Sequence, residues 1–352
     1  MDWETIRLIM HTSLRPTPVE GTFTIRNFTF ESGETLDALT IGYVMYGTLN
    51  DARDNLCLVM PGTSNLRHGT AEHVGPGRAY DTNRYCVVCT DAIGGGTSSK
   101  PADGLFDKFP RYTIRDMARA QYQLAAEGLG LGSRQVALLA GASMGAFQTL
   151  EWLIHFPDSV KNAVLLVPAW KAGNTFLMAT KRMFDIIALD PNWRGGQYHT
   201  HAPLIQPEAG QRTAGRHYFT WTVTDDYLET TPLNTLHDEA ERAGNGFASW
   251  DAWSLLRRYQ ASSAHDVRTP FGGDLSRALA RVKAHTLVLP CSQDRLLGLE
   301  NAKEIAQGIS NGHYAEVNSN KGHLAWRPSL GSPETVAITK YINSHALQTD
   351  QQ

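Results

Sequence analysis

The pentapeptide Gly141-Ala142-Ser143-Met144-Gly145 constrains this chain most, because it has the form G-x-S-x-G and lies between two contrasting segments. The apolar run 136–140 before it predicts a buried strand, and the stretch 146–153 after it predicts a helix. A strand that turns directly into a helix needs glycines here, because a Cβ would collide with the neighbouring strand or helix. The pattern therefore predicts a sharp turn that presents Ser143 as a nucleophile. The alternative is a chance match in a glycine-rich loop.

Composition favours a folded enzyme over a nucleic-acid or membrane protein. The chain has 352 residues, of which 42% are hydrophobic and 19% charged, and its formal net charge is -3. This balance argues against nucleic acid or anionic membrane as the main partner. No window approaches the ~20 apolar residues of a membrane span. Residues 1–7 carry acids early and lack the apolar stretch of a secretory signal. We therefore expect a cytoplasmic protein.

Neither the cysteines nor the paired histidines predict a special site. Four cysteines in a chain of this length do not make a disulfide framework. Cys86 and Cys89 have redox-motif spacing, but residues three apart on a strand face opposite sides, so we expect buried thiols. His199-Thr200-His201 suggests a metal, yet no further ligands are spaced for a site. A solvated loop, with no metal, is the expectation there.

Strands and helices alternate in the first half of the chain and again near its end. The expected strands are 22–30, 36–46, 56–60, 85–89, 136–140, 163–167, 286–289 and 314–317. The expected helices in these two parts include 113–127, with Thr113 as N-cap and Asp116 in the first turn, then 300–308 and 333–345. Such alternation predicts a mostly parallel sheet with helices on both faces.

The segment 170–281 has no clear β run and contains helix-like stretches. A helical insertion between two late strands predicts a lid over the carboxyl edge of the sheet, where open α/β sheets bind ligands. We therefore expect a core formed by 1–169 and 282–352, and a lid formed by 170–281.

A serine nucleophile needs a base, and the base needs an acid that orients it. After a turn of this type the order along the chain is serine, acid, histidine. Asp294 lies in a loop after an expected strand, and His323 lies between the last strand and the last helix. Asp266, in the expected lid, is the alternative acid. His313 is the other histidine after the acid, but it starts a strand rather than ending one.

An oxyanion would need two backbone N–H donors. The residue after the nucleophile, Met144, supplies one. The loop after an early strand supplies the other, and Gly62 in Met60-Pro61-Gly62-Thr63 is the candidate. Pro61-Gly62 also reads as a simple turn, and both interpretations can hold.

Four longer motifs resemble the homoserine O-acetyltransferase family of α/β-hydrolases. They are 75–85 leading to Gly94-Gly95-Gly96, 113–121, 141–152 and 190–196. The resemblance runs over nearly the whole chain and implies an α/β-hydrolase fold, with an eight-stranded sheet and a helical lid. It implies that Asp294 and His323 are the acid and base, in agreement with the reading from the residues. It also implies a homodimer formed through the lid helices.

The departures from that family concern the substrate. Its transferases usually place an Asp, which holds the substrate ammonium group, directly after the catalytic histidine; here the position is Leu324. Losing such a charge pair costs on the order of 2–5 kcal/mol. The family usually has His-Ala-Leu-Thr-Gly where this chain has Met60-Pro61-Gly62-Thr63-Ser64. In that family an arginine of the lid binds the homoserine carboxylate. No arginine of this chain falls in register with it, although Arg216 and Arg212 lie near that position in the sequence.

These features predict a serine carboxylic ester hydrolase that acts on small, acetyl-type esters through an acyl-enzyme and needs no cofactor. The alternative is an acyl-CoA-dependent O-acyltransferase, with acetyl-CoA as co-substrate and a hydroxyl acceptor in place of water. A third hypothesis is a binding protein on a hydrolase scaffold. The presence of all three catalytic candidates in the right order argues against it.

Overall fold

The computed structural model of the protein describes residues 16–327 and 329–349. The expected absence of a secretory signal concerns residues 1–7, which lie outside the described residues.

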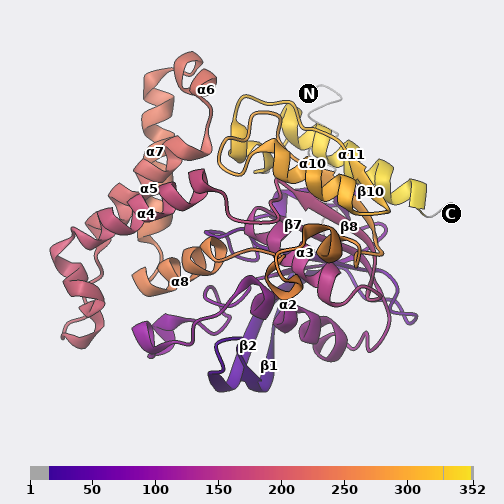
Figure 1. The fold of residues 1–352 in the computed structure, drawn as a ribbon, viewed down its shortest axis with the longest axis horizontal. Helices are drawn as coiled ribbons and strands as arrows, with labels where there is room; N and C mark the ends of the chain where they lie inside the picture. Colours follow the sequence, from indigo (N-terminus) through magenta and orange to yellow (C-terminus); the bar gives the residue numbers. More distant parts are fainter. Residues whose placement is uncertain (1–15, 328, 350–352) are drawn as a thin grey trace.

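An eight-stranded sheet forms the centre of the molecule (Figure 1). Its strands are β1 (Val19–Thr29), β2 (Thr35–Tyr46), β3 (Leu56–Met60), β6 (Cys86–Thr90), β7 (Val136–Ala142), β8 (Val160–Leu166), β9 (His285–Leu289) and β10 (Gly312–Tyr314). They lie in the order β1-β2-β6-β3-β7-β8-β9-β10. β2 pairs antiparallel with β1 and β6, and every other neighbouring pair is parallel. The mostly parallel sheet is therefore confirmed. A small second sheet pairs β4 (Val74–Gly75) with β5 (Tyr80–Asp81).

The central strands are buried on both faces. β3, β6 and β7 are buried along their whole lengths, as expected of parallel strands covered on both sides. The apolar side chains separate into two clusters, one on each face of the sheet. Cys86 belongs to one cluster and Cys89 to the other. All four cysteines are buried and none forms a disulfide, which confirms the reading of Cys86 and Cys89 as buried thiols.

Helices cover the sheet and fill the segment between β8 and β9. The α-helices are α2 (Ile114–Gln123), α3 (Met144–His155), α4 (Asn174–Ala188), α5 (Glu208–Thr222), α6 (Asp225–Thr230), α7 (Leu233–Ala248), α8 (Ala252–Ser263), α9 (Leu275–Leu279), α10 (Leu299–Gly308) and α11 (Pro333–Thr349). α2 continues into a π-helical turn at Leu124–Gly128. No helix in the described parts of the chain combines the length and apolarity needed to cross a bilayer.

Residues 170–281, all of them described, contain helices and no strand of the sheet. Their one β-type contact is an isolated bridge between Lys171 and Asp266. Figure 1 shows α4, α5, α6 and α7 gathered on one side of the sheet, while α8 packs against α4 and against the core segment Pro101–Asp103. The helical insertion is thus present as expected. The division of the chain into core and lid at 169/170 and 281/282 stays a prediction.

The last strand differs from its expected position. It spans Gly312–Tyr314 instead of 314–317. Beyond Tyr314, the adjacent segment of the sheet continues into Pro290, which directly follows β9. Proline has no N–H to donate, so a regular ladder ends there. Three backbone hydrogen bonds still hold the segment beside β9 and the residues after it: Ala315 N to Val288 O, Val317 N to Pro290 O, and Ser292 N to Val317 O.

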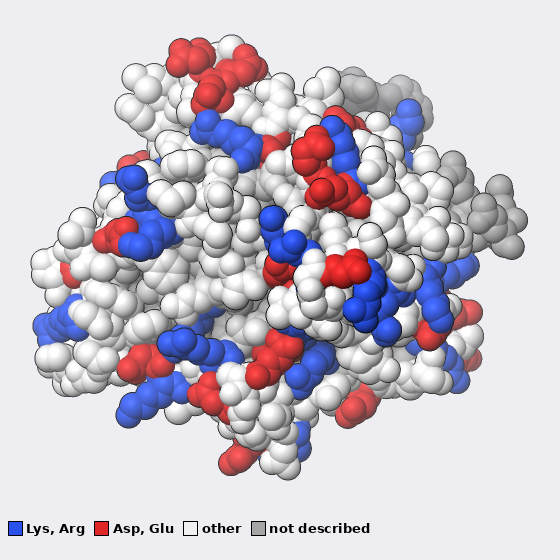
Figure 2. All heavy atoms as spheres, viewed as in Figure 1, with Lys and Arg blue, Asp and Glu red and all other residues white. Residues whose placement is uncertain are grey.

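Charged side chains of both signs are interspersed on the face drawn in Figure 2, with acidic side chains gathered over α6.

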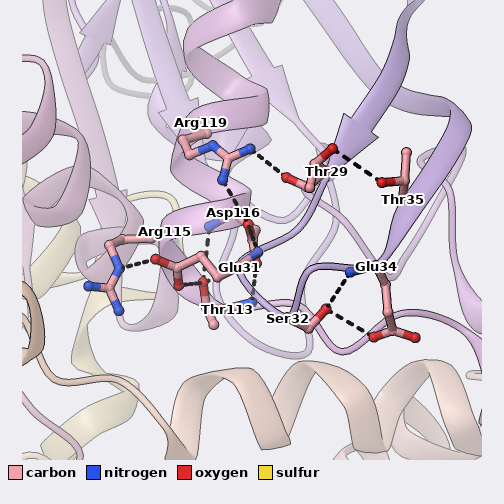
Figure 3. A network of polar contacts seen from close by, with 9 residues as sticks. All are labelled: Thr29, Glu31, Ser32, Glu34, Thr35, Thr113, Arg115, Asp116 and Arg119. Carbon is pink, nitrogen blue, oxygen red and sulfur yellow. Dashed lines mark hydrogen bonds and ion pairs between the residues drawn. The ribbon is translucent and has the colours of Figure 1, made fainter.

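A buried carboxylate ties the β1–β2 hairpin to α2 (Figure 3). Thr113 caps the helix: its hydroxyl accepts a hydrogen bond from Asp116 N at 3.1 Å, and its own N–H donates to Asp116 Oδ2 at 3.0 Å. Asp116 Oδ1 accepts the N–H of Glu31, between the two strands, at 3.0 Å and lies 3.3 Å from Arg119. The N-cap expected at Thr113 is confirmed.

Asp116→Asn should lower the free energy of unfolding by about 1–3 kcal/mol. Each carboxylate oxygen of Asp116 accepts a backbone N–H. In the variant an NH2 group, which cannot accept a hydrogen bond, would replace one of these oxygens. Urea denaturation followed by tryptophan fluorescence would measure the loss. Asp37→Asn, at an exposed position on β2, is the matched control and should leave the midpoint unchanged. Equal midpoints for the two variants would contradict the role given to Asp116.

Candidate active site

Ser143 lies at the turn between β7 and α3 with φ 57° and ψ -122°. A non-glycine residue held at positive φ stores on the order of 1–3 kcal/mol of strain. The flanking glycines make the turn sterically allowed. A Cβ at Gly141 would lie 2.3 Å from the carbonyl oxygen of Gly145, and a Cβ at Gly145 would lie 2.3 Å from Met60 O. The G-x-S-x-G pattern therefore forms the expected strand-turn-helix rather than a loop.

The structure brings Ser143, His323 and Asp294 together in one chain of hydrogen bonds. Asp294, after β9, accepts His323 Nδ1–H on Oδ2 at 2.7 Å, and His323 Nε2 lies 3.0 Å from Ser143 Oγ. Because Nδ1 donates its proton to the carboxylate, the lone pair of Nε2 faces the serine. All three side chains are buried. This arrangement can remove the Ser143 proton and stabilise the resulting imidazolium.

Backbone contacts fix the acid and the base in position. Asp294 Oδ1 accepts the N–H groups of Leu296 and Leu297 at 2.9 and 3.2 Å, which orients its other oxygen toward His323. His323 lies in a 3-10 turn, Gly322–Trp326. The buried His73 donates from Nε2 to Trp326 O at 3.0 Å and so holds the end of that turn.

The alternative candidates lie elsewhere. Asp266 is bound by Arg268, whose guanidinium reaches its two oxygens at 3.0 and 2.8 Å. His313 sits within β10, and His199 pairs with Asp107 at 3.2 Å. Among the described residues no three His, Cys, Asp or Glu side chains gather as a metal site would require.

Two backbone N–H groups are available beside Ser143. Met144 is the first residue of α3, where the N–H groups are unpaired and the helix dipole is positive. Gly62 follows β3 and lines the same cavity as Ser143. In the described part of the chain, neither N–H donates to a protein acceptor. The carbonyl of Pro61 accepts Gln148 Nε2 at 3.3 Å, which holds the Gly62 loop against α3.

A fully buried arginine from α8 holds the same loop from the other side. Arg258 Nη2 donates to Gly62 O at 2.9 Å, and its guanidinium lies 5.2 Å from the centroid of the Trp250 ring. Burial lowers the pKa of Arg258 to about 10, so the side chain is still a cation at neutral pH. A Cβ at Gly95 would lie 2.7 Å from Arg258 Nη1 and 2.6 Å from the Trp250 ring. The glycine run 94–96 therefore makes room for this arginine.

A cavity of about 400 Å³ opens onto Ser143 and His323. Its wall comes from the loop after β3, from α5, α7 and α8, and from the turn that carries His323. α5 contributes Gly215, Tyr218, Phe219 and Thr222. Leu324, proposed from the sequence as a substrate contact, also lines the cavity.

Arg216, the other proposed substrate contact, does not line this cavity. It pairs with Glu241 of α7 at 2.7 Å, and Arg212 pairs with Glu208 on the surface of α5. Because each helical residue is rotated by about 100° from the last, Gly215 faces the cavity while Arg216 turns toward α7.

Sequence reasoning missed the α5 face, Tyr259 and Arg327. The spacing 215, 218, 219, 222 is the i, i+3, i+4, i+7 pattern of one helix face and was a usable signal. Arg327 follows His323 by four residues, and that proximity was the only sign of it in the sequence.

Arg258→Met should slow the reaction of Ser143 with a fluorophosphonate by on the order of 10- to 100-fold, because the Gly62 loop loses an anchor and small displacements of a donor are costly. Intact-protein mass spectrometry would give the rate. The matched control is Arg257→Met on the same helix, whose guanidinium bonds Asp107 O and lies over Trp253 instead. Equal rates for both variants and the wild type would contradict this role.

The unfolding free energy should fall as the pH drops from about 6.5 toward 4. Burial lowers the pKa of His73 to about 4, so over this range the unfolded chain binds a proton that the folded chain refuses. The contribution of His73 is at most roughly 3 kcal/mol, from 1.36 kcal/mol per pKa unit. His73→Gln should flatten this dependence in urea titrations at several pH values. His68→Gln, which changes a half-exposed side chain, is the control and should leave the pH dependence unchanged. The same pH dependence in His73→Gln and the wild type would disprove the role given to His73.

Comparison with known proteins supports what this geometry indicates. The model of the alpha/beta hydrolase fold family matches residues 60–326. A homoserine O-acetyltransferase of Thermobifida fusca is 32% identical over 330 residues, covering 83% of this chain and 86% of the relative. An ethyl acetate hydrolase of Pseudomonas veronii is 29% identical over 308 residues, covering 84% of this chain and 86% of the relative.

Solved structures show the same two kinds of relative. An acetylester hydrolase from Corynebacterium glutamicum superposes with a TM-score of 0.83 at 25% identity, covering 94% of this chain and 96% of that one. A homoserine O-acetyltransferase from Bacillus anthracis superposes with a TM-score of 0.80 at 25% identity, covering 93% and 98%. This chain is therefore an enzyme that belongs to the α/β-hydrolase fold family, with homoserine O-acetyltransferases and acetyl ester hydrolases among its relatives.

Proposed function

We propose that the protein is a serine carboxylic ester hydrolase that acts on small, acetyl-type esters. The hydrogen-bonded chain from Asp294 through His323 to Ser143 carries the proposal, with contacts of 2.7 and 3.0 Å. A serine so placed is an activated nucleophile, and the available N–H groups of Met144 and Gly62 would receive the negative charge of a tetrahedral intermediate.

The reaction has two halves. His323 Nε2 takes the proton of Ser143 as its oxygen attacks the ester carbonyl, and the same proton passes to the departing alcohol oxygen. Water then attacks the acyl-enzyme, with His323 again as base, and releases the acid and free Ser143. Asp294 stabilises the imidazolium in both halves, because its carboxylate stays hydrogen-bonded to Nδ1.

Leu324 favours water over an amino-acid acceptor. Its side chain lines the cavity directly after His323 in the chain. An apolar group there offers no charge or hydrogen bond to an ammonium, and an unpaired buried ammonium is strongly disfavoured. An acceptor such as homoserine would therefore lack a partner for its amino group at this position.

An acyl-CoA-dependent O-acyltransferase is the second candidate, and the name of the Thermobifida fusca relative favours it. The first half-reaction would be the same, with acetyl-CoA as the acyl donor and co-substrate. A hydroxyl acceptor would replace water in the second half.

Four further expectations accompany the proposal and stay predictions. The enzyme would use no resident cofactor or metal. Its partner would be a small-molecule ester, and it would bind neither nucleic acid nor membrane. It would form a homodimer through the lid helices. It would act in the cytoplasm.

Purified protein should release p-nitrophenol from p-nitrophenyl acetate without any added acceptor. Ser143→Ala should lower this rate by about 10³-fold or more, because the nucleophile is removed. Ser276→Ala, at an exposed position of α9, is the control and should keep the full rate. Circular dichroism would establish that both variants are folded.

Two results would count against the proposal. Release of CoA from acetyl-CoA that requires homoserine or another alcohol, together with slow ester hydrolysis, would favour the transferase. An undiminished rate in Ser143→Ala would show that another residue is the nucleophile.

A further inference from the structure

The cavity contains an arginine without an acidic partner. Arg327 lines the same cavity as Ser143 and His323. Its side chain stays accessible to water, yet the protein around the guanidinium desolvates it and lowers its pKa. It is thus a cation on the cavity wall that both water and a ligand can reach. Within the described residues, no carboxylate lies within ion-pair distance of it.

The acid whose charge acts on Arg327 is already engaged. Glu239 attracts the guanidinium from a distance. Both of its carboxylate oxygens lie 3.0 Å from the hydroxyl of Tyr227, and Arg242 Nη2 lies 3.8 Å away. Glu239 therefore has closer partners, and Arg327 remains free to bind a ligand.

Arg327 is a cation of the cavity wall with no ion-pair partner among the described residues. The charged residues of the wall, as far as the structure describes it, are Glu72, Arg242 and Arg327. Arg242 lies 3.8 Å from Glu239, whereas no described carboxylate lies within ion-pair distance of Arg327. A fixed cation attracts anions and repels cations at this part of the wall.

Arg327 directly follows the 3-10 turn that contains Leu324. Arg327 N donates to Leu324 O at 3.0 Å at the end of the turn Gly322–Trp326. Side chains three residues apart in a 3-10 helix lie above one another, so Leu324 and Arg327 share a side of the turn that carries His323. Leu324 and Arg327, which both line the cavity, can therefore offer an apolar contact and a cation to one ligand.

Hydroxyl groups add neutral donors near the cation. Tyr259, which lines the cavity, lies close enough to Arg327 for their charges to interact, and its hydroxyl is beside Ser64. Burial raises the pKa of Tyr259, so its hydroxyl keeps its proton at neutral pH and can donate it. The guanidinium fork itself matches the two oxygens of a carboxylate or phosphate.

We propose that Arg327 makes this enzyme selective for esters that carry an anionic group, a carboxylate or a phosphate, separated from the ester by an apolar spacer that packs on Leu324. This inference rests on the proposed ester hydrolysis and names its substrate class.

Three acetate esters of one phenol framework test the selectivity: 4-acetoxybenzoate, its methyl ester and 4-acetoxyphenyl-trimethylammonium. Comparing each variant with the wild type on the same ester cancels the intrinsic reactivity. Arg327→Met should lower kcat/KM for the anionic ester by about 10- to 100-fold, mainly through KM, because a charge-assisted pair is lost. The neutral ester should change by less than about twofold. Arg327→Lys should keep part of the preference. Arg277→Met, at an exposed position of α9 outside the cavity wall, is the control and should leave the rates for all three esters unchanged.

Several outcomes would overturn the inference. An equal fall for all three esters would mean that Arg327 supports the fold of the turn, and an unchanged preference would mean that it does not contact the substrate. A loss seen only for acetyl-CoA relative to its 3′-dephospho form would assign the cation to a CoA phosphate instead.

Failure of this inference can be told apart from failure of the proposed function. Binding of 4-hydroxybenzoate to the Ser143→Ala protein, measured by calorimetry, needs no catalysis. It should weaken by about 10-fold or more when Arg327→Met is added, even if the wild type hydrolyses no ester. Unaltered affinity would overturn the anion site, whatever the reaction at Ser143.

Discussion

The close approach of α3 to the loop after β3 is the contact on which the site depends. Gly145 sits so near Met60 that a Cβ would lie 2.3 Å from its carbonyl oxygen. One turn later, Gln148 bonds the carbonyl of Pro61. The strained serine and the Gly62 loop are thus held by the same interface. Under the proposed role of Met144 and Gly62 as oxyanion donors, a movement at this interface would carry Gly62 away from Ser143 and Met144.

The helical insertion is part of this site as well as a cover for it. Arg258 of α8 reaches the carbonyl of Gly62, and the N-cap Thr224 of α6 donates to Asn320 O, just before the turn of His323. A fully buried cation is tolerated because carbonyls and the Trp250 ring surround it. Docking of α8 therefore both desolvates Arg258 and orients the loop, which couples the insertion to the nucleophile.

Much of the fold followed from the sequence, because buried parallel strands are continuous apolar runs and their carboxyl ends meet at one edge. That geometry is also why Ser143, Asp294 and His323 could be predicted to be neighbours from their order in the chain and their places after expected strands. The bounds of β10 were missed, because Pro290, directly after β9, ends the ladder. The roles of Arg258 and Arg327 depend on which helix packs where, and no local pattern encodes that. Arg216 was misplaced for the same reason, since a rotation of one residue on α5 decides which side chain faces the cavity.

The cavity also bears on whether water or a hydroxyl takes the acyl group. An acetyl group fills a small part of about 400 Å³, which leaves room for water once an alcohol has departed. An acyl-enzyme here meets that water unless an acceptor is bound firmly enough to exclude it. Leu324 offers such an acceptor no charge, and Arg327 offers a cation. Under the proposed ester hydrolysis, an anionic alcohol would therefore be the acceptor best able to compete with water. The same cation that selects the substrate would then also decide which alcohols can compete with water.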